Sequence, residues 1–158
     1  MENQPIMNAL DAVAGSQASA YITLNGNRYC FMQLKSFESS MDINTIEVPI
    51  LGKPGKGNKP AGWTGSWKGT AYYNQSVMRE MLLEYKRTGK LDPFDIQVTN
   101  EDATASVGRQ VIILKGCVTK GGILAKFDAD SEVLEEDIEG TFDDWEMPEK
   151  FNMLAGMA

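Results

Sequence analysis

The chain has 158 residues, of which 42% are hydrophobic and 23% charged, a composition typical of one soluble globular domain. Its net charge of −7 argues against a protein that holds DNA by its phosphates, and the absence of histidine excludes histidine-based catalysis and most zinc sites. Its apolar runs are too short to span a membrane, and no export signal is visible at its start. Cys30 and Cys117 are therefore expected to be reduced core residues.

Residues 1–19 have only weak helical spacing and are predicted to form an N-terminal arm before a single β domain, residues 20–158. Two β-rich runs, residues 20–24 and 28–35, flank the dipeptide Asn25-Gly26. Because both of these turn residues accept a positive φ, the pattern predicts a tight β-hairpin at the start of the domain.

A second, much longer hairpin is predicted next. Alternation over residues 37–50 places Ile46, Val48 and Ile50 on one face of a strand, and another strand-like run covers residues 63–73. Residues 52–65, between them, hold five glycines, two prolines and three lysines. Because proline lacks a backbone donor and glycine is costly to order, we predict a long basic loop that protrudes over residues 52–62. Its candidate contact residues are Lys53, Lys56, Lys59 and Trp63.

One helix is predicted after the long hairpin. Apolar residues recur with helical spacing from Val77 to Tyr85, Asn74 or Ser76 is placed to cap the start, and Gly89 is placed to end the helix. Such a stripe is typical of core packing. Further strands are predicted over residues 94–99, 110–118, 122–128 and 133–145. The fold class is therefore mainly β: a β-sandwich or open barrel of about seven strands with one flanking helix.

Charge is distributed unevenly along the chain. Residues 48–79 contain five bases and no acid, whereas residues 128–149 contain eleven acids and no base. The layout suits a basic end that meets the acidic surface of another copy, although two unrelated solvated faces would give the same pattern. In the last predicted strand the acids gather on one face, which indicates either a solubilising outer face or a surface meant to be negative. They are Glu135, Asp137, Glu139 and Asp143.

No motif for catalysis, a cofactor or a metal is found. The glycine-rich loop lacks the spacing of a phosphate-binding loop. Residues 128–139 approach an EF-hand count, but Val133 stands where the loop needs glycine and the flanks are strand-like. Asp143 and Asp144 are sequence neighbours, which point to opposite faces of a strand and cannot act as a glycosidase pair. We therefore expect no enzyme, no cofactor and no metal site.

Several runs, in this order and spacing, resemble the tail tube proteins of contractile, myovirus-type phage tails, including those of defective Bacillus prophages. The resemblance covers residues 20–151 and is carried by Val48-Pro49-Ile50-Leu51-Gly52-Lys53, Lys59-Pro60-Ala61-Gly62, Tyr72-Tyr73-Asn74, residues 94–102, Gly108-Arg109-Gln110, residues 127–130 and Leu134-Glu135-Glu136.

This resemblance implies a structural protein of the virion tail, made in the host cytoplasm, whose hexameric rings stack into a hollow inner tube that conducts DNA. It implies a long hairpin that reaches the neighbouring ring, and the acidic face named above would line the lumen. Self-association, a tail sheath protein, a tape-measure protein and baseplate or initiator proteins are the implied partners, with no membrane.

A second interpretation, from a different class of protein, stays open at this point. A stand-alone β-sandwich could use aromatic side chains to stack on sugar rings as a carbohydrate-binding module. The candidates for such a platform are Trp63, Trp67, Tyr72 and Tyr73. A binding module would remain monomeric at high concentration, whereas a tube protein would assemble.

Overall fold

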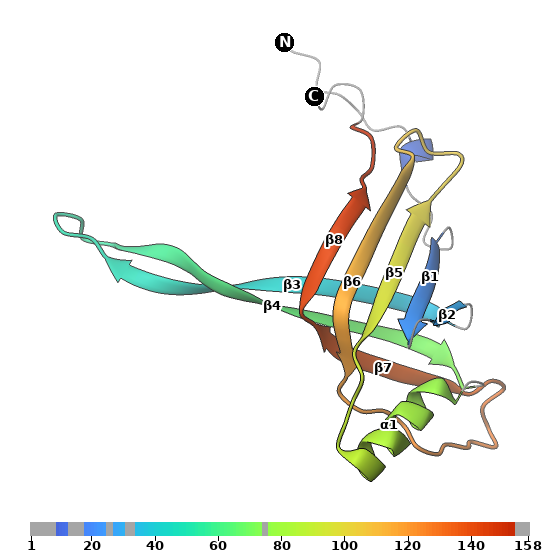
Figure 1. The fold of residues 1–158 in the computed structure, drawn as a ribbon. Coiled ribbons are helices and arrows are strands. Elements are labelled where there is room, and N and C mark those ends of the chain that lie inside the picture. Colours follow the sequence, from blue (N-terminus) through green and yellow to red (C-terminus); the bar gives the residue numbers. More distant parts are fainter. Residues whose placement is uncertain (1–8, 13–17, 25–26, 31–33, 74–75, 154–158) are drawn as a thin grey trace. The chain divides into compact units, whose positions relative to one another are not determined.

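The computed structural model describes residues 9–12, 18–24, 27–30, 34–73 and 76–153, without the side chains of residues 11, 24 and 27–30. The described chain is mainly β, with eight strands, one α-helix and a short 3-10 helix at Ala9–Asp11 (Figure 1). The strands follow the order β2-β1-β5-β6-β7-β4-β3, with β8 paired to β6, so the sheet stays open at β2 and β3. The prediction of a mainly β, open architecture with one helix is confirmed.

The chain divides into two compact units. Unit 1 contains residues 1–32, 93–116 and 145–158, and unit 2 contains residues 33–92 and 117–144. The strands of unit 1 are β1 (Ala18–Leu24), β2 (Asn27–Cys30), β5 (Phe94–Glu101), most of β6 (Arg109–Thr119) and most of β8 (Asp144–Glu149). Leu24 pairs with Asn27 across the β1–β2 turn, which confirms the predicted tight hairpin.

The core of unit 1 forms where alternate residues of neighbouring strands meet. Ile22 of β1 lies opposite Ile96 of β5, and both are almost completely buried. Phe94 and Leu114 are buried to a similar degree. Two ion pairs tie β8 to β6: Lys115 Nζ lies 2.7 Å from Glu146 Oε1, and the Arg109 guanidinium binds both carboxylate oxygens of Glu149.

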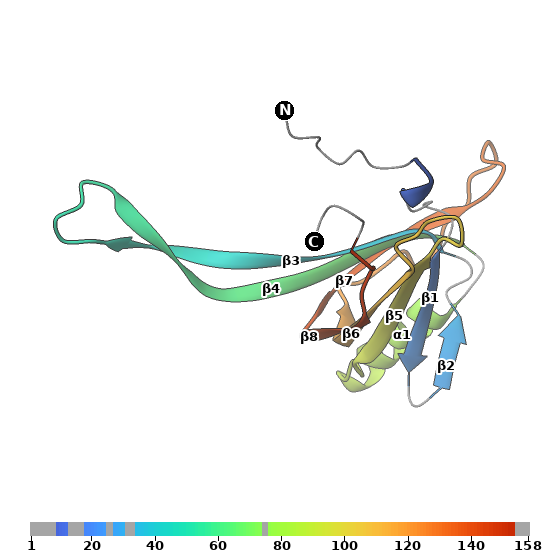
Figure 2. The ribbon, with the colours of Figure 1, turned by 90° about the horizontal axis from the view of Figure 1, so that it is seen from above.

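Unit 2 is built on two long antiparallel strands, β3 (Leu34–Pro49) and β4 (Lys56–Tyr72). β7 (Glu135–Phe142) pairs with the inner half of β4, from Gly65 to Tyr72, and the end of β6 pairs with β7. The helix α1 (Val77–Thr88) follows β4. Beyond Gly65, β4 pairs only with β3, so the two strands continue as a ribbon (Figures 1 and 2).

Glycines opposite aromatic residues make the core of unit 2. Trp67 is 1% exposed and lies over Gly140, its cross-strand partner, and its indole Nε1 donates a 3.2 Å hydrogen bond to Thr141 O. Phe142 likewise lies over its partner Gly65. A Cβ at either glycine would meet the facing ring, so only glycine lets these rings pack flat on the sheet.

The helix follows the predicted pattern with two differences. Gly89 ends α1 in the left-handed conformation at φ 74°, as predicted. Ser76 occupies the N-cap position without a side-chain capping hydrogen bond, and Asn74 lies outside the described residues. Met81 is buried, but Tyr85 is 54% exposed, so the apolar stripe ends one turn before the pattern suggests. No helix in the described ranges is long and apolar enough to cross a membrane.

The prediction of a long irregular loop over residues 52–62 is wrong, because β4 already begins at Lys56. The turn is confined to residues 50–55. In this part β4 pairs on one side only, so the missing N–H of Pro60 costs no second ladder bond. Between the pairs Ile43–Trp63 and Thr45–Pro60, β4 carries one extra residue; this bulge contains Gly62 at φ 99°.

Two other predicted strands are also corrected. Residues 122–128 form no strand, and two of their carbonyl groups accept hydrogen bonds from side chains: Arg79 donates to Ile123 O and Tyr73 to Leu124 O. The strand predicted over residues 133–145 is two strands, β7 and β8, separated at Asp143: β7 pairs with β4 and with the end of β6, whereas β8 pairs with β6.

Candidate functional site

One side of the three-stranded part of unit 2 carries polar side chains, with Tyr72 at its end. Because side chains alternate along each strand, the cross-strand rows Ser36–Thr70–Asp137, Glu38–Lys68–Glu139 and Ser40–Ser66–Thr141 share this side. We call it the polar face. It consists of Ser36, Glu38 and Ser40 on β3, Ser66, Lys68, Thr70 and Tyr72 on β4, and Glu135, Asp137, Glu139 and Thr141 on β7, and it continues to the pair Asp42–Thr64 just beyond β7.

Three of the four predicted acidic residues lie on the polar face. Glu135, Asp137 and Glu139 alternate with buried residues of β7, whereas Asp143 lies beyond the end of that strand. These acids have basic neighbours, which the alternation along one strand had not indicated. Lys35 Nζ lies 2.9 Å from Glu135 Oε1, a contact that raises the pKa of Lys35. Carboxylates nevertheless outnumber lysines on the polar face. They are Glu38, Asp42, Glu135, Asp137 and Glu139.

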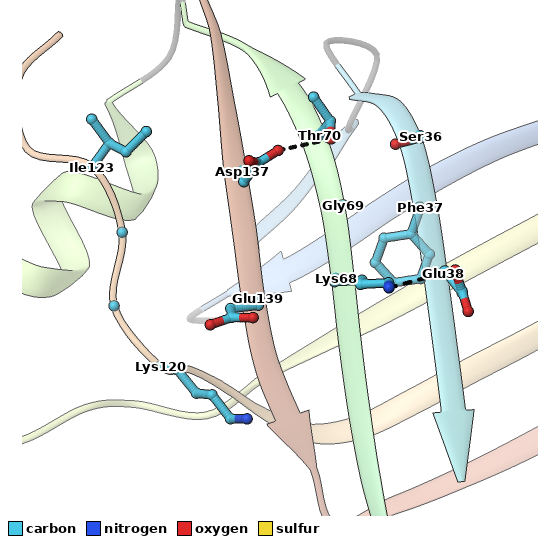
Figure 3. Close-up of a pocket in the computed structure, with 12 residues that line it drawn as sticks. Ser36, Phe37, Glu38, Lys68, Gly69, Thr70, Lys120, Ile123, Asp137 and Glu139 are labelled. Carbon is cyan, nitrogen blue, oxygen red and sulfur yellow. Dashed lines mark hydrogen bonds and ion pairs between the residues drawn. The ribbon is translucent and has the colours of Figure 1, made fainter.

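The neutralising partners come from other strands, which explains why a single-strand pattern missed them. Thr70 Oγ1 donates a 3.0 Å hydrogen bond to Asp137 Oδ1, and Lys68 sits directly between Glu38 and Glu139 (Figure 3). Lys68 Nζ lies 4.0 Å from Glu38 Oε2. Cross-strand pairs of this kind contribute up to about 1 kcal/mol each, so groups on β3 and β4 offset part of the repulsion among the acids of β7.

A shallow hollow of about 800 Å³ opens on the polar face (Figure 3). Its lining mixes carboxylates with the ammonium groups of Lys68 and Lys120, so it favours neither an anion nor a cation strongly. Within the part of the chain that the structure describes, no cluster of three or more His, Cys, Asp or Glu residues could hold a metal ion.

The outer ribbon, residues 43–63 with its turn, is the second candidate surface. From here on it is called the arm, and it is a different segment from the N-terminal arm predicted over residues 1–19. In the three-stranded part of unit 2, odd-numbered apolar residues of β3 such as Phe37 lie on the side of Trp67. Beyond Ile43, the apolar residues of β3 and the start of the turn include the even-numbered Ile46, Val48 and Ile50, which are 51%, 37% and 45% exposed. The apolar side of the ribbon thus changes at the bulge, and the arm carries a half-exposed apolar row.

The arm also carries the predicted basic residues. Lys53 lies in the turn, Lys56 directly follows it, and Lys59 lies opposite Ile46. Lys56 Nζ lies 3.6 Å from Glu47 Oε2, and both side chains are well exposed. Leu51, at the tip, is fully exposed. The arm therefore offers aliphatic side chains next to lysines, a combination that a solvated loop has no reason to hold in one place.

The tryptophans occupy other positions than the sequence suggested. Trp63 belongs to the root of the arm, where its ring centroid lies 6.0 Å from that of Phe142. Because Trp67 is buried, it cannot stack on a sugar. The aromatic platform considered for a carbohydrate-binding module therefore loses one of its four candidate residues. Cys117 is buried in the core and forms no disulfide, as predicted; the side chain of Cys30 lies outside the described residues.

Comparisons with known proteins agree on one kind of protein. A family model described as "Phage tail tube protein" matches residues 6–149. The chain is 27% identical over 146 residues to "Phage-like element PBSX protein XkdM" from Bacillus subtilis (strain 168), covering 92% of this chain and 97% of that protein. It is 28% identical to "Uncharacterized protein YqbM" of the same strain, over 91% of this chain and 95% of the relative.

Solved structures share the fold at low sequence identity. A chain of the anti-feeding prophage (AFP) baseplate has a TM-score of 0.64 at 12% identity, with 93% of this chain and 97% of that chain covered. A chain of the PVC sheath/tube terminator of an extracellular contractile injection system has a TM-score of 0.63 at 11% identity, with 82% and 93% covered.

Proposed function

Because the chain belongs to the phage tail tube protein family, we propose that six copies close into a ring and that the rings stack into the inner tube of a contractile tail. DNA passes through the lumen of this tube without specific binding. The family places the protein in the virion tail as a structural component. We propose the host cytoplasm as its location before assembly, and tail sheath, tape-measure and baseplate or initiator proteins as its partners.

The observation that carries this proposal is the apolar row of the arm. Ile46, Val48 and Ile50 are roughly half exposed on a ribbon with only two strands. A two-stranded ribbon has little reason to keep such residues unless another surface covers them. Burying the exposed half of each would stabilise a contact by about 1 kcal/mol. Six such contacts per ring junction would act together.

We assign the polar face to the lumen. Strands that border a water-filled channel need hydrophilic side chains, and except for Tyr72 the residues on this side of β3, β4 and β7 in the three-stranded region are polar. Carboxylates outnumber lysines on the face, so the wall repels phosphates, while the interspersed Lys68 limits repulsion between neighbouring copies. Replacing Glu135, Asp137 and Glu139 by lysine should leave assembly intact but slow DNA passage.

The assembly proposal is tested by changing the apolar row and counting tubes. The variant Ile46→Thr/Val48→Thr keeps β-branched side chains while it removes apolar surface. The matched control Thr45→Ser/Glu47→Gln changes the opposite side of the same strand. Sedimentation and negative-stain microscopy of the full chain, over a range of concentrations, measure assembly.

Wild type and control should form six-fold rings and tubes, and the Thr variant should remain a folded monomer. The proposed function fails if wild-type protein stays monomeric at the highest concentration and with a tail initiator complex present. It also fails if the Thr variant assembles at the wild-type concentration.

A further inference from the structure

The loop between β6 and β7, residues 120–134, exposes apolar side chains that the structure of unit 2 does not cover. Leu124 is 70% exposed, Phe127 92% and Val133 57%. We call this segment the β6–β7 loop. Three large apolar side chains so exposed within ten residues exceed the scattered exposure usual on a monomer surface. They indicate that something covers the loop in the working protein.

The loop is held in a defined shape at both ends. The backbone N–H of Tyr73 donates a 3.0 Å hydrogen bond to Leu134 O, and the Tyr73 hydroxyl donates to Leu124 O at 3.4 Å. Lys126 Nζ donates to Glu135 O at 2.7 Å, and Arg79 Nη1 donates to Ile123 O at 3.5 Å. Tyr73 thus brings the two ends of the loop together, which makes it a compact surface loop that presents its side chains outward.

The apolar side chains of the loop stand among acids. Asp128, Asp130 and Glu132 are exposed between Phe127 and Val133. The basic Lys126 is engaged with a backbone oxygen of β7. The loop therefore combines an apolar centre with a negative border. The tip of the arm has the complementary character: the fully exposed Leu51 and the apolar row lie among lysines.

We propose that the arm tip of one copy docks on the β6–β7 loop of a second copy, with aliphatic side chains against Leu124 and Phe127 and arm lysines against Asp130 and Glu132. This inference rests on the proposed function and adds the receptor for the arm. Matching apolar and charged patches of this kind set both affinity and partner choice.

The position of the two surfaces requires that the partner be another molecule. The arm turn precedes Lys56, the first residue of β4, and Tyr73, which holds the β6–β7 loop, directly follows Tyr72, the last. Figure 1 shows these surfaces at opposite ends of unit 2. A strand of this length spans about 50 Å, so one chain cannot join its own two ends. Two different complementary patches give a head-to-tail contact, which builds closed rings or open stacks.

Charge reversal with rescue tests the docking. The arm variant is Lys53→Glu/Lys59→Glu, which spares Lys56 because it already pairs with Glu47. The loop variant is Asp130→Lys/Glu132→Lys, which spares Asp128 because its carboxylate accepts the Asp130 N–H and holds the turn. The combined variant carries all four changes. A matched control joins the arm variant to Glu84→Lys/Asp92→Lys, two exposed acids elsewhere in unit 2.

Each of the two reversed variants should raise the concentration needed for half-maximal assembly by at least roughly tenfold, and the combined variant should return it to within about threefold of wild type. The matched control should not recover. Normal assembly of the loop variant, or no recovery in the combined variant, would overturn the docking while leaving the arm's role intact. Normal assembly of the apolar-row variant Ile46→Thr/Val48→Thr would instead count against the proposed function itself.

A covalent measurement serves where a reversed variant loses its fold by circular dichroism. In a Cys30→Ser background, Leu51→Cys and Phe127→Cys in one chain should form disulfide-linked ladders on oxidation of assembled protein. The native Cys117 is buried and stays unreactive. Either new cysteine alone should stop at dimers. If the chain with both new cysteines also stops at dimers, the two surfaces do not meet.

Discussion

Arg79 of α1 joins the helix to three other parts of unit 2, so its loss should be costly. Its guanidinium lies 2.7 Å from Glu136 Oε2 and stacks 4.4 Å from the centroid of the Tyr73 ring, and it also donates to Ile123 O. The two side chains of the ion pair are only 18% and 9% exposed. Arg79→Met leaves the carboxylate buried without its charge partner. We expect a loss of about 3–5 kcal/mol, a large part of a typical 5–15 kcal/mol of stability.

A double-mutant cycle separates that cost from lost packing. Glu136→Leu alone leaves a partly buried guanidinium unpaired, whereas Arg79→Met/Glu136→Leu removes both charges and should be milder than the sum of the singles by about 2 kcal/mol or more. Arg87→Met, an exposed change on the same helix, should stay within about 0.5 kcal/mol of wild type.

Urea unfolding of dilute protein, followed by tryptophan fluorescence and circular dichroism, supplies the free energies for this cycle. A cost below about 1 kcal/mol for Arg79→Met would show that water screens the pair. Strict additivity of the two single changes would refute the reasoning in another way, since it would mean that the two groups do not interact.

Two further predictions concern single positions. Gly140→Ala should destabilise the chain by at least about 1–3 kcal/mol, because the new Cβ would meet the backbone oxygen of Val118 and the Trp67 ring, whereas Gly55→Ala has open space and should be nearly neutral in the same unfolding assay. Arg109 lowers the pKa of Glu149, so that pair stabilises the fold above the ordinary glutamate pKa, and its contribution is lost as the pH falls through the lowered value. Glu149→Gln should therefore be less stable than wild type near neutral pH and approach it in acid, as thermal unfolding across pH would show.

The sequence predicted those elements whose signals are local. The β1–β2 hairpin followed from Asn25-Gly26, and the end of α1 from Gly89, because each signal acts within a few residues. The length of β4 was missed because Pro60 and several glycines argue against a strand with two neighbours. In the arm each strand has only one neighbour, because β7 ends before it. Where β7 ends depends on the tertiary structure, which composition does not reveal.

The candidate surfaces were predictable only in part. The acids of β7 were found by alternation, but their partners Lys35, Lys68 and Thr70 come from strands that pair across long sequence distances. Residues 122–128 of the β6–β7 loop were mistaken for a strand because they contain the apolar run Ile123-Leu124-Ala125 and Phe127. The one available signal was the pair Gly121-Gly122 at its start, which weakens a strand.

The continuity of β4 also fixes a length. In an assembly that joins the arm tip to the β6–β7 loop, 17 consecutive residues of one strand separate the surface that reaches out from the surface that receives. Extended backbone barely stretches, so the length of β4 sets the distance between successive copies in such an assembly. Inserting two residues into both β3 and β4 beyond the bulge would lengthen the repeat by about 7 Å and keep every side chain on its side. Inserting one residue in each would turn the apolar row to the opposite side of the ribbon.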